Sequence, residues 1–481
     1  MTDDGELRRN ASWQQQVLRR IPAIDEVLRD ERIRRLINNS GANLVGWVRS
    51  AVAQVRSELL NVPASDVDTI FPTSLMTDII AKTEQIAELE TRRAIQHVIN
   101  ATGTLLHTNL GRCPLARRAI ERMQMATSYS NIELDLASGK RGKRGARVME
   151  LLARLTGAED ALVVNNCAAA TMLALAATAA GREVIVSRGQ LVEIGGGFRL
   201  PEVFRAAGVT LREVGTTNRT YVSDYQTATS DGTGAILRVH RSNFAQIGFV
   251  EEPNISDLAS LERGNSIPLI EDLGSGCIVS LAAYGLSEPT VGQSVSAGAD
   301  LTLFSGDKLF GGPQSGIVVG RAQWIARLRS HPMMRAMRVD KVTLAALEAT
   351  AEIYLDGRAT DELPLYQMLG VSCDQLRRRA SDIREQLHAF NSIDVRIAES
   401  VAFVGGGSLP GRTVPSVCLE FGGVDTEALA QQLRLGQSPV VTRVADGRVV
   451  VDLRTVHESE LNELTNSLQS ALSSMSEQSA R

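Results

Sequence analysis

The chain contains no run of 18 or more consecutive apolar residues, so the sequence predicts no membrane-spanning helix. Its first residues, Met1-Thr-Asp-Asp-Gly-Glu6, lack the basic-then-apolar order of a secretory signal peptide. The five cysteines are scattered and form no Cys-x-x-Cys or Cys/His cluster, which argues against a disulfide framework and against a zinc site. We therefore expect a cytoplasmic protein without a metal.

An excess of positive charge is also missing. The formal net charge of −4 gives no bulk attraction to nucleic acid, so no DNA partner is expected and any RNA contact must come from local basic patches. The hydrophobic content of 43% and the mean hydropathy of −0.04 allow a packed core. A chain of 481 residues is long enough for two or three domains.

Hydrophobic patterning divides the chain into a helical region, an α/β region and a smaller C-terminal region. Residues 1–90 show helical periodicity at 13–18, 33–37, 44–48 and from 76 onward. In residues 91–340, apolar runs typical of strands alternate with helical stretches, which predicts a mostly parallel sheet with helices on both faces. These strands are expected at 161–164, 183–186, 211–214, 235–239, 268–270, 301–304 and 317–319. Residues 341–470 predict a small α+β domain with strands at 417–421 and 449–452, and residues 471–481 a flexible tail.

Lys308 follows one of these predicted strands. The run Leu301-Thr-Leu-Phe304 ends in Ser305-Gly-Asp-Lys308, and a glycine-rich segment comes next. Such a position suits a lysine at the wall of an active site, where its amine can form a Schiff base with the aldehyde of pyridoxal phosphate (PLP). The alternative is an ordinary lysine after a strand.

Asp272 ends another apolar run, Ile267-Pro-Leu-Ile-Glu-Asp272, and is also followed by glycines. A buried aspartate is the usual partner of the protonated pyridine nitrogen of PLP. Because open α/β sheets bind ligands at the carboxyl ends of their strands, Asp272 and Lys308 can face one crevice. The alternative is that Asp272 only caps a turn.

A third candidate lies where the predicted strand 161–164 meets an alanine-rich helix. Asn165, Asn166, Cys167 and Ala168 open this helix, and Thr171 lies one turn further on. Free N–H groups and the positive end of the helix dipole suit a phosphate there, although an ordinary N-cap by either asparagine would look similar. The order of phosphate loop, acid and lysine is that of the aspartate-aminotransferase-like PLP fold.

Longer motifs make a resemblance specific. The chain is similar to the bacterial selenocysteine synthases, the L-seryl-tRNA(Sec) selenium transferases, in five segments that occur in the same order. The segments are Ile99-Asn-Ala-Thr-Gly103-Thr-Leu-Leu-His107-Thr-Asn-Leu-Gly111-Arg112, Ser187-Arg-Gly-Gln-Leu-Val-Glu193-Ile-Gly-Gly196, Val214-Gly-Thr-Thr-Asn218-Arg219-Thr220, Ser305-Gly-Asp-Lys308 and His331-Pro-Met-Met-Arg335-Ala-Met-Arg338-Val-Asp340-Lys341-Val-Thr-Leu-Ala-Ala-Leu-Glu348.

The resemblance implies a PLP-dependent transferase that converts seryl-tRNA(Sec) to selenocysteinyl-tRNA(Sec) with selenophosphate. It implies that Lys308 and Asp272 are catalytic and that Asn165, Asn166, Cys167, Ala168, His240 and Ser305 join them around the cofactor. Arg112, Arg335 and Arg338 would hold the selenophosphate anion. Arg335 and Arg338 are three apart on an expected helix and would share a face, although without the resemblance a surface ion-pair network is the simpler reading.

The resemblance also assigns tRNA binding to the helical region 1–90, whose arginines are interleaved with acids. From charge alone, these arginines would be a solvated helical face with ion pairs. Relatives of this fold type build active sites across a dimer interface, so the resemblance implies at least a homodimer, and in this family a ring of dimers.

Three positions depart from the family pattern. Cys167 stands where a third asparagine is common, Arg241 where a threonine is common, and the basic segment 140–147 lacks a histidine often found there. Two alternatives therefore stay open: a related PLP-dependent lyase acting on a small phosphorylated amino compound, and a non-catalytic tRNA-binding homologue. Intact Lys308 and Asp272 argue against the second, and the helical N-terminal region against the first.

Overall fold

The computed structural model describes residues 18–40, 43–61, 72–194, 197–262, 264, 266–390 and 393–479. The chain divides into two compact units, Met1–His97 and Val98–Arg481. The helix expected at 13–18 lies outside the described residues except for Leu18. In the described part, we find no helix with the length and apolar character needed to cross a bilayer.

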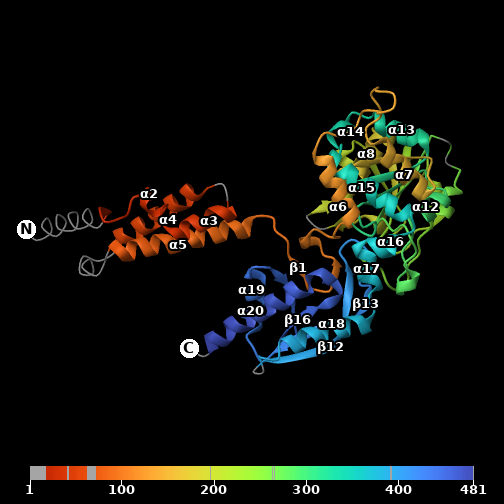
Figure 1. Cartoon of the computed structure of the whole chain (residues 1–481). Helices are drawn as coiled ribbons and strands as arrows, with labels where there is room; N and C mark the ends of the chain where they lie inside the picture. Colours follow the sequence, from red (N-terminus) through yellow and green to blue (C-terminus); the bar gives the residue numbers. More distant parts are fainter. Residues whose placement is uncertain are drawn as a thin grey trace, which may run out of the picture. The chain divides into compact units, whose positions relative to one another are not determined.

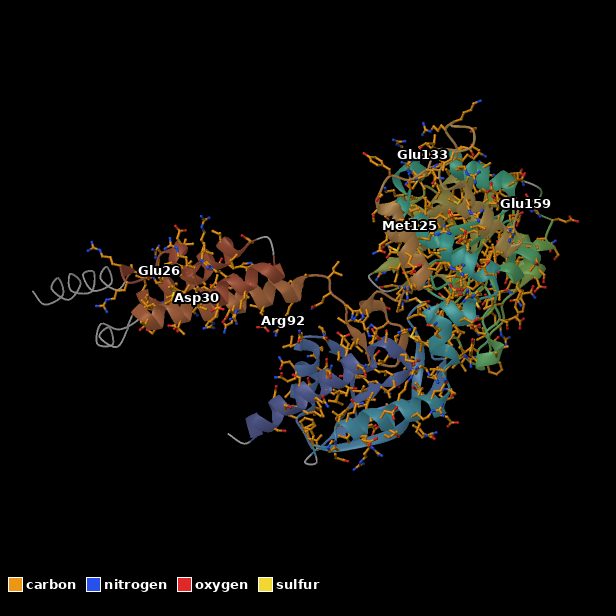
Figure 2. All side chains as sticks on the ribbon, viewed as in Figure 1. Glu26, Asp30, Arg92, Met125, Glu133 and Glu159 are labelled. Carbon is orange, nitrogen blue, oxygen red and sulfur yellow. The ribbon has the colours of Figure 1, made fainter. Side chains whose placement is uncertain are left out.

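The first unit is a helical bundle made of α2 (Ile24–Val27), α3 (Glu31–Ser40), α4 (Leu44–Leu60) and α5 (Pro72–Arg93) (Figure 1). In α4, the buried residues Val48, Ala51, Val55 and Leu59 recur at spacings of three and four, so one face of the helix packs into the core. The opposite faces of the bundle carry charged side chains (Figure 2).

The second unit is built around a seven-stranded sheet in the order β3-β11-β10-β9-β8-β4-β7. Every neighbouring pair in it is parallel except those of β11, which runs antiparallel to both β10 and β3. The strands are β3 (Asp160–Val164), β4 (Glu183–Ser187), β7 (Thr210–Val214), β8 (Thr233–Val239), β9 (Leu269–Gly274), β10 (Leu301–Ser305) and β11 (Gly316–Gly320). All seven strands expected in this region are present, and the mostly parallel sheet is confirmed.

Helices cover both faces of this sheet. Leu162 and Val163 are neighbours on β3, yet they belong to hydrophobic cores on opposite faces, as the alternation of side chains along a strand requires. One core contains α7 (Ala146–Thr156), α12 (Val291–Ser296) and α15 (Lys341–Leu355), with α6 (Arg117–Thr127) packed on α15. The other contains α8 (Cys167–Ala179), α9 (Leu200–Ala206) and α13 (Ala322–Ser330). Because the strands are buried on both faces, they are continuous apolar runs, which is why they could be recognised in the sequence.

A second, five-stranded sheet forms the C-terminal part of this unit, in the order β15-β16-β13-β12-β2. Its strands are β2 (Thr104–Leu106), β12 (Asp394–Gly405), β13 (Thr413–Gly422), β15 (Arg443–Ala445) and β16 (Arg448–Asp452). Its core also takes in α18 (Cys373–Gln386), α19 (Thr426–Leu435) and α20 (Leu461–Ser479). The parallel pair β2–β12 joins the segment before the large sheet to the C-terminal part. The remaining short elements are β1 (Ile99–Asn100), β5 (Glu193–Ile194), β6 (Phe198–Arg199), β14 (Val440–Val441), α10 (Val222–Ala228), α11 (Ile255–Ala259), α14 (Met333–Ala336), α16 (Ala359–Glu362) and α17 (Pro364–Gly370).

The C-terminal tail needs a correction. Helix α20 runs to Ser479, and Ala471 and Leu472 are buried in the C-terminal core. The part of the tail up to Ser479 is therefore helical, because its apolar residues at helical spacing outweigh the serine-rich composition that favoured a loose end.

Candidate active site

Lys308 lies in the turn that follows β10, and its side chain is buried, with 8% of the residue exposed. Backbone hydrogen bonds fix this turn, because the amide of Leu309 donates to the carbonyl of Ser275 (2.9 Å) and that of Gly306 to Ser315 (2.9 Å). Burial lowers the pKa of the Lys308 amine, and the nearby guanidinium of Arg112 lowers it further. A larger fraction of this amine is therefore neutral, and so nucleophilic, than in an exposed lysine.

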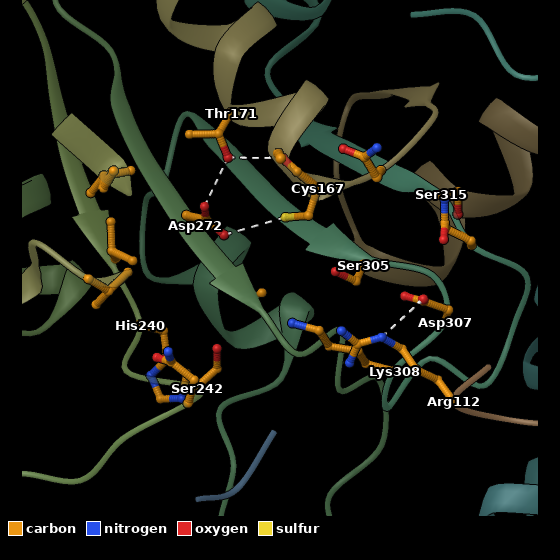
Figure 3. Close-up of a pocket in the computed structure, with 18 residues that line it drawn as sticks. Arg112, Cys167, Thr171, His240, Ser242, Asp272, Ser305, Asp307, Lys308 and Ser315 are labelled. Atoms are coloured by element: carbon orange, nitrogen blue, oxygen red, sulfur yellow. Dashed lines mark hydrogen bonds and ion pairs between the residues drawn. The ribbon is translucent and has the colours of Figure 1, made fainter. Parts of the chain in front are cut away.

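Asp272 lies on β9, and its carboxylate faces the start of α8 instead of capping a turn (Figure 3). It accepts hydrogen bonds from the hydroxyl of Thr171 (2.9 Å) and from the thiol of Cys167 (3.5 Å). Burial raises the pKa of Asp272, while the hydrogen bond from Thr171 and the charge of Lys308 oppose that rise. The pair of donors from one helix therefore holds the carboxylate in a fixed orientation.

The start of α8 has the geometry of an N-capped helix. The side-chain oxygen of Asn166 accepts a hydrogen bond from the amide of Ala169 (2.9 Å). Asn166 is therefore an ordinary N-cap, as the alternative interpretation of the sequence had it. A Cβ on Gly316 would lie 2.0 Å from the Asn166 carbonyl, which explains why β11 begins with glycine at this close approach. Asn166, Cys167 and Ala168 line a cavity at this helix end, where unpaired N–H groups attract an anion.

That cavity has a volume of about 280 Å³ and is lined by the ends of β8, β9 and β10 and by the start of α8. Of the candidate residues, it brings together Lys308, Asp272, Asn166, Cys167, Ala168, His240, Ser305 and Arg112. Thr171, Ser242, Asp307, Gln314 and Ser315 also line it, and these were not among the candidates. Thr171 could have been found from its spacing of four from Cys167 on one helix face, and Asp307 from its place in the Ser305-Gly-Asp-Lys308 motif.

Asn165, by contrast, does not line the cavity. Its backbone amide donates to the carbonyl of Met337 (3.0 Å), and its side-chain NH₂ group faces the carbonyls of Met337 and Arg338 (3.2 Å each). Asn165 therefore fixes the chain that follows α14 instead of facing the cofactor cavity.

Arg112 reaches the cavity from an unusual backbone position. Its φ of 66° is in the left-handed region, and its Nη1 donates to the carbonyl of Gly406 (2.8 Å). Its Nε lies 3.4 Å from Oδ2 of Asp307, which gives the guanidinium an acidic neighbour next to Lys308. The C-terminal part thus contributes backbone to the same site as the large sheet.

Arg335 and Arg338 are not brought to this cavity, and the expectation that they share a helix face is wrong. The short helix α14 ends at Ala336, so Arg338 lies beyond it. Both arginines are exposed, and Nη1 of Arg338 lies 3.8 Å from Oε1 of Glu133. After the helix ends, the backbone amide of Asn165 bonds to the carbonyl of Met337, and its side-chain amide faces the carbonyls of Met337 and Arg338.

Two of the departures from the family pattern, Cys167 and Arg241, are compensated by their surroundings. Burial and the charge of Asp272 raise the pKa of the Cys167 thiol well above its usual range, so Cys167 stays a neutral donor to Asp272. Arg241 does not line the cavity, and its guanidinium pairs with Glu252. Glu252 is also paired with Arg238 (3.1 Å), which contacts Glu271 (2.5 Å), so the extra cation is part of a partly buried charge network.

The donor set fits PLP. The cavity offers a buried amine with a lowered pKa, a carboxylate held by two donors, and helix N–H groups for a phosphate. It offers no metal site, since we find no cluster of three His, Cys, Asp or Glu side chains within the described ranges that could hold an ion.

Comparisons with known proteins agree with this geometry. The family model described as L-seryl-tRNA selenium transferase matches residues 98–457, and the one described as selenocysteine synthase N terminal matches residues 18–56. The L-seryl-tRNA(Sec) selenium transferase of Geotalea daltonii is 42% identical over 460 residues, which are 94% of this chain and 99% of that protein. That of Clostridium botulinum strain Okra is 40% identical over 454 residues, 93% of this chain and 97% of the relative.

The solved structure of D-glucosaminate-6-phosphate ammonia-lyase superposes with a TM-score of 0.57 at 24% identity, covering 81% of this chain and 99% of that chain. This likeness shows that the two chains share a fold, and the mostly parallel sheet with helices on both faces is the architecture that was expected. The family match covers most of the chain and the relatives align over nearly their whole length, so the resemblance read from the motifs is confirmed. The chain belongs to the L-seryl-tRNA selenium transferase family.

Proposed function

We propose that this chain converts L-seryl-tRNA(Sec) to L-selenocysteinyl-tRNA(Sec), with PLP as cofactor and selenophosphate as the selenium donor. The observation that carries the proposal is the placement of a buried Lys308 amine and the Asp272 carboxylate in one cavity at the strand ends. The names of the relatives support the tRNA substrate, and the family match disfavours a lyase for small phosphorylated amino compounds.

Bound PLP supplies an aldehyde that holds the substrate amine and a ring that accepts the electron pair left when Cα loses its proton. Lys308 would hold the cofactor, and Asp272 would keep a proton on the ring nitrogen. The N–H groups of Cys167 and Ala168 would receive the phosphate, with Ser305 beside them.

Lys308 has a second task once the seryl amine replaces it. A neutral Nζ can accept the Cα proton, and its lowered pKa favours the neutral form at the start of this step. Loss of that proton would allow hydroxide to leave from Cβ. The selenium of selenophosphate would then add to Cβ as a proton returns to Cα, and water would break the Se–P bond to release phosphate. Because Lys308 is buried, bulk water has little access to the proton that it holds.

Arg112 would attract the phosphate group of selenophosphate, since it is the arginine that lines this cavity in the described part of the chain. Arg335 and Arg338 lie outside the cavity, so their proposed anion contacts require a second copy that completes the site. Exposed apolar side chains on and after α6 support self-association: Met125 is 70% exposed, Tyr129 fully and Leu136 73%. We propose a homodimer as the minimum and a ring of dimers as the assembly.

The helical unit would bind the tRNA. Arg19, Arg20, Arg29 and Arg34 are exposed on it, while Arg32 and Arg35 pair with Glu84 and Glu31. Recognition of a folded RNA needs positioned phosphate contacts more than a high net charge. Replacing Arg29 and Arg34 by glutamine in the full chain should weaken tRNA binding and lower its salt dependence by roughly 0.7 to 0.9 per lost phosphate contact. Unchanged affinity and salt dependence would count against this role.

The decisive assay supplies purified protein with seryl-tRNA(Sec), seryl-tRNA(Ser) or free serine, each with selenophosphate. Conversion confined to seryl-tRNA(Sec) would support both the chemistry and the partner. A protein that binds PLP but converts none of the three would point to a lyase for small substrates. A protein that binds tRNA but no PLP would point to a non-catalytic homologue.

A further inference from the structure

A buried carboxylate lies against a histidine of the cavity wall. The side chain of Glu288 is 4% exposed, and its Oε1 lies 3.3 Å from Nε2 of His240. Apart from this contact, whose geometry is not that of a hydrogen bond, the oxygen has no hydrogen-bond partner within the described residues. Glu288 is in the segment between Gly285 and α12, and nothing in the sequence motifs had drawn attention to it.

His240 connects Glu288 to the active site. It directly follows β8, lines the cavity, and its backbone amide donates to the carbonyl of Asp272 (2.8 Å). Figure 3 shows Asp272 between the α8 side chains and His240. The backbone of His240 is therefore fixed to the strand that carries Asp272, and Nε2 of its imidazole lies against Glu288.

The other titratable groups around the pair do not offer Glu288 a counter-charge. Cys277 is near Glu288, and burial followed by the Glu288 charge raises the pKa of its thiol to about 12, so it stays neutral. Asp272 is acidic, and Lys308 faces the cavity from β10. Within the described ranges, His240 supplies the only nitrogen of a basic side chain within ion-pair distance of Glu288.

A carboxylate buried to this degree is costly unless a donor or a cation compensates for its lost hydration. An apolar side chain could fill the same space behind the wall without that cost. We therefore look for the role of this carboxylate in its effect on His240. In other active sites, a carboxylate next to a histidine fixes the tautomer and the orientation of the imidazole.

We propose that Glu288 is a positioning residue, which keeps a proton on Nε2 of His240 and fixes the imidazole against the cofactor cavity. This proposal rests on the proposed function, because His240 acts on PLP only if PLP occupies the cavity. His240 would then present a ring of defined orientation and protonation to the bound cofactor. Glu288 itself touches neither cofactor nor substrate.

The test measures PLP binding by the full chain and the pH midpoint of the visible absorbance of lysine-bound PLP. We expect Glu288→Gln to weaken PLP binding about tenfold and to move the midpoint, with partial recovery in Glu288→Asp, which keeps the charge. Ser287→Ala, an exposed neighbour in the same segment, serves as the control and should change neither. A purely structural role would lower thermal stability without moving the midpoint.

A double-mutant cycle shows whether Glu288 acts through His240. In a His240→Gln background, Glu288→Gln should weaken PLP binding by less than twofold further. An undiminished tenfold effect in that background, or no effect in the wild-type background, would overturn the proposal. If Glu288→Gln does not fold, Glu288→Leu, an uncharged variant of similar volume, takes its place, and an unchanged midpoint would again overturn the proposal. A wild-type chain that takes up no PLP would overturn the cofactor assignment as well, whereas normal uptake in both chains would overturn this proposal alone.

Discussion

A substitution at Gly407 tests whether the C-terminal sheet positions the side chain of Lys308, which follows a strand of the large sheet. Gly407 lies in the turn between β12 and β13 with a φ of +80°. A Cβ placed there would be 2.9 Å from both Cε and Nζ of Lys308 and 3.5 Å from Nη1 of Arg112. Gly407→Ala should therefore push the reactive amine out of position.

The magnitude follows from two separate costs. An alanine at this φ costs roughly 1–2 kcal/mol of folding free energy, because the left-handed region is unfavourable for a side chain with a Cβ. Carbon contacts are comfortable at about 3.5 Å or more, so Lys308 must also move by at least roughly 0.6 Å. A misplacement of about 1 Å at a reacting group can reduce the rate on the order of 100-fold.

Gly411→Ala is the matched control, since Gly411 lies in the same turn at a φ of +69° and a Cβ added to it would have no other atom within 4 Å. Both variants should lose similar stability in a thermal unfolding experiment. Only Gly407→Ala should slow the capture of PLP by Lys308, followed as the growth of visible absorbance after PLP is added to the apoprotein. Equal capture rates in the two variants would refute the contact between Gly407 and the lysine.

Four further outcomes test the site itself. Lys308→Ala should abolish the visible absorbance of lysine-bound PLP, and an unchanged spectrum would remove Lys308 from the mechanism. Asp272→Asn should weaken PLP binding and abolish turnover, so near-normal turnover would contradict the pairing with the ring nitrogen. Burial and Arg112 lower the pKa of Lys308, so PLP capture should rise with pH around a midpoint below the ordinary lysine pKa of roughly 10.4. Arg112→Gln should move that midpoint upward, because it removes a charge that lowers the pKa. A downward shift would show that the effect of Arg112 has the opposite sign. Cys167→Ala should weaken PLP binding by about 1 kcal/mol, roughly fivefold, and Thr171→Val by at least as much, because each removes one donor to Asp272; full binding by either variant would show that its donor is dispensable.

The large sheet could be predicted from the sequence because each of its strands is recognisable as a short apolar run. Strands buried on both faces are short apolar runs, and the segments at Lys308 and Asp272 end in polar residues at the ligand-binding edge. The strand β12, by contrast, was not expected. Only part of it is buried, and residues such as Arg396 and Glu399 interrupt its apolar pattern.

Contacts between residues far apart in the chain could not be predicted from the sequence, because they depend on the path of the folded backbone. Arg112 reaches the cavity through a positive φ and a hydrogen bond to Gly406, which is nearly 300 residues away in the chain. Arg335 and Arg338 showed the opposite error, since a helical spacing implied a shared face that the early end of α14 removes. Glu288 had no motif at all, because its significance depends on a fold that places it behind His240.

Two of the three departures from the family pattern, Cys167 and Arg241, show how residues can change while the electrostatics of the site are kept. An amide NH₂ and a neutral thiol are both donors, so Cys167 can meet Asp272 where the family commonly has asparagine, provided that the thiol does not ionise. Burial beside a carboxylate keeps the thiol pKa high and so supplies that condition. Arg241 adds a cation, and its pairing with Glu252 confines the charge to a network away from the cavity. Because neither change alters the charge that Lys308 and Asp272 meet, the departures argue for an enzyme that has retained its chemistry, and against a homologue that has lost it.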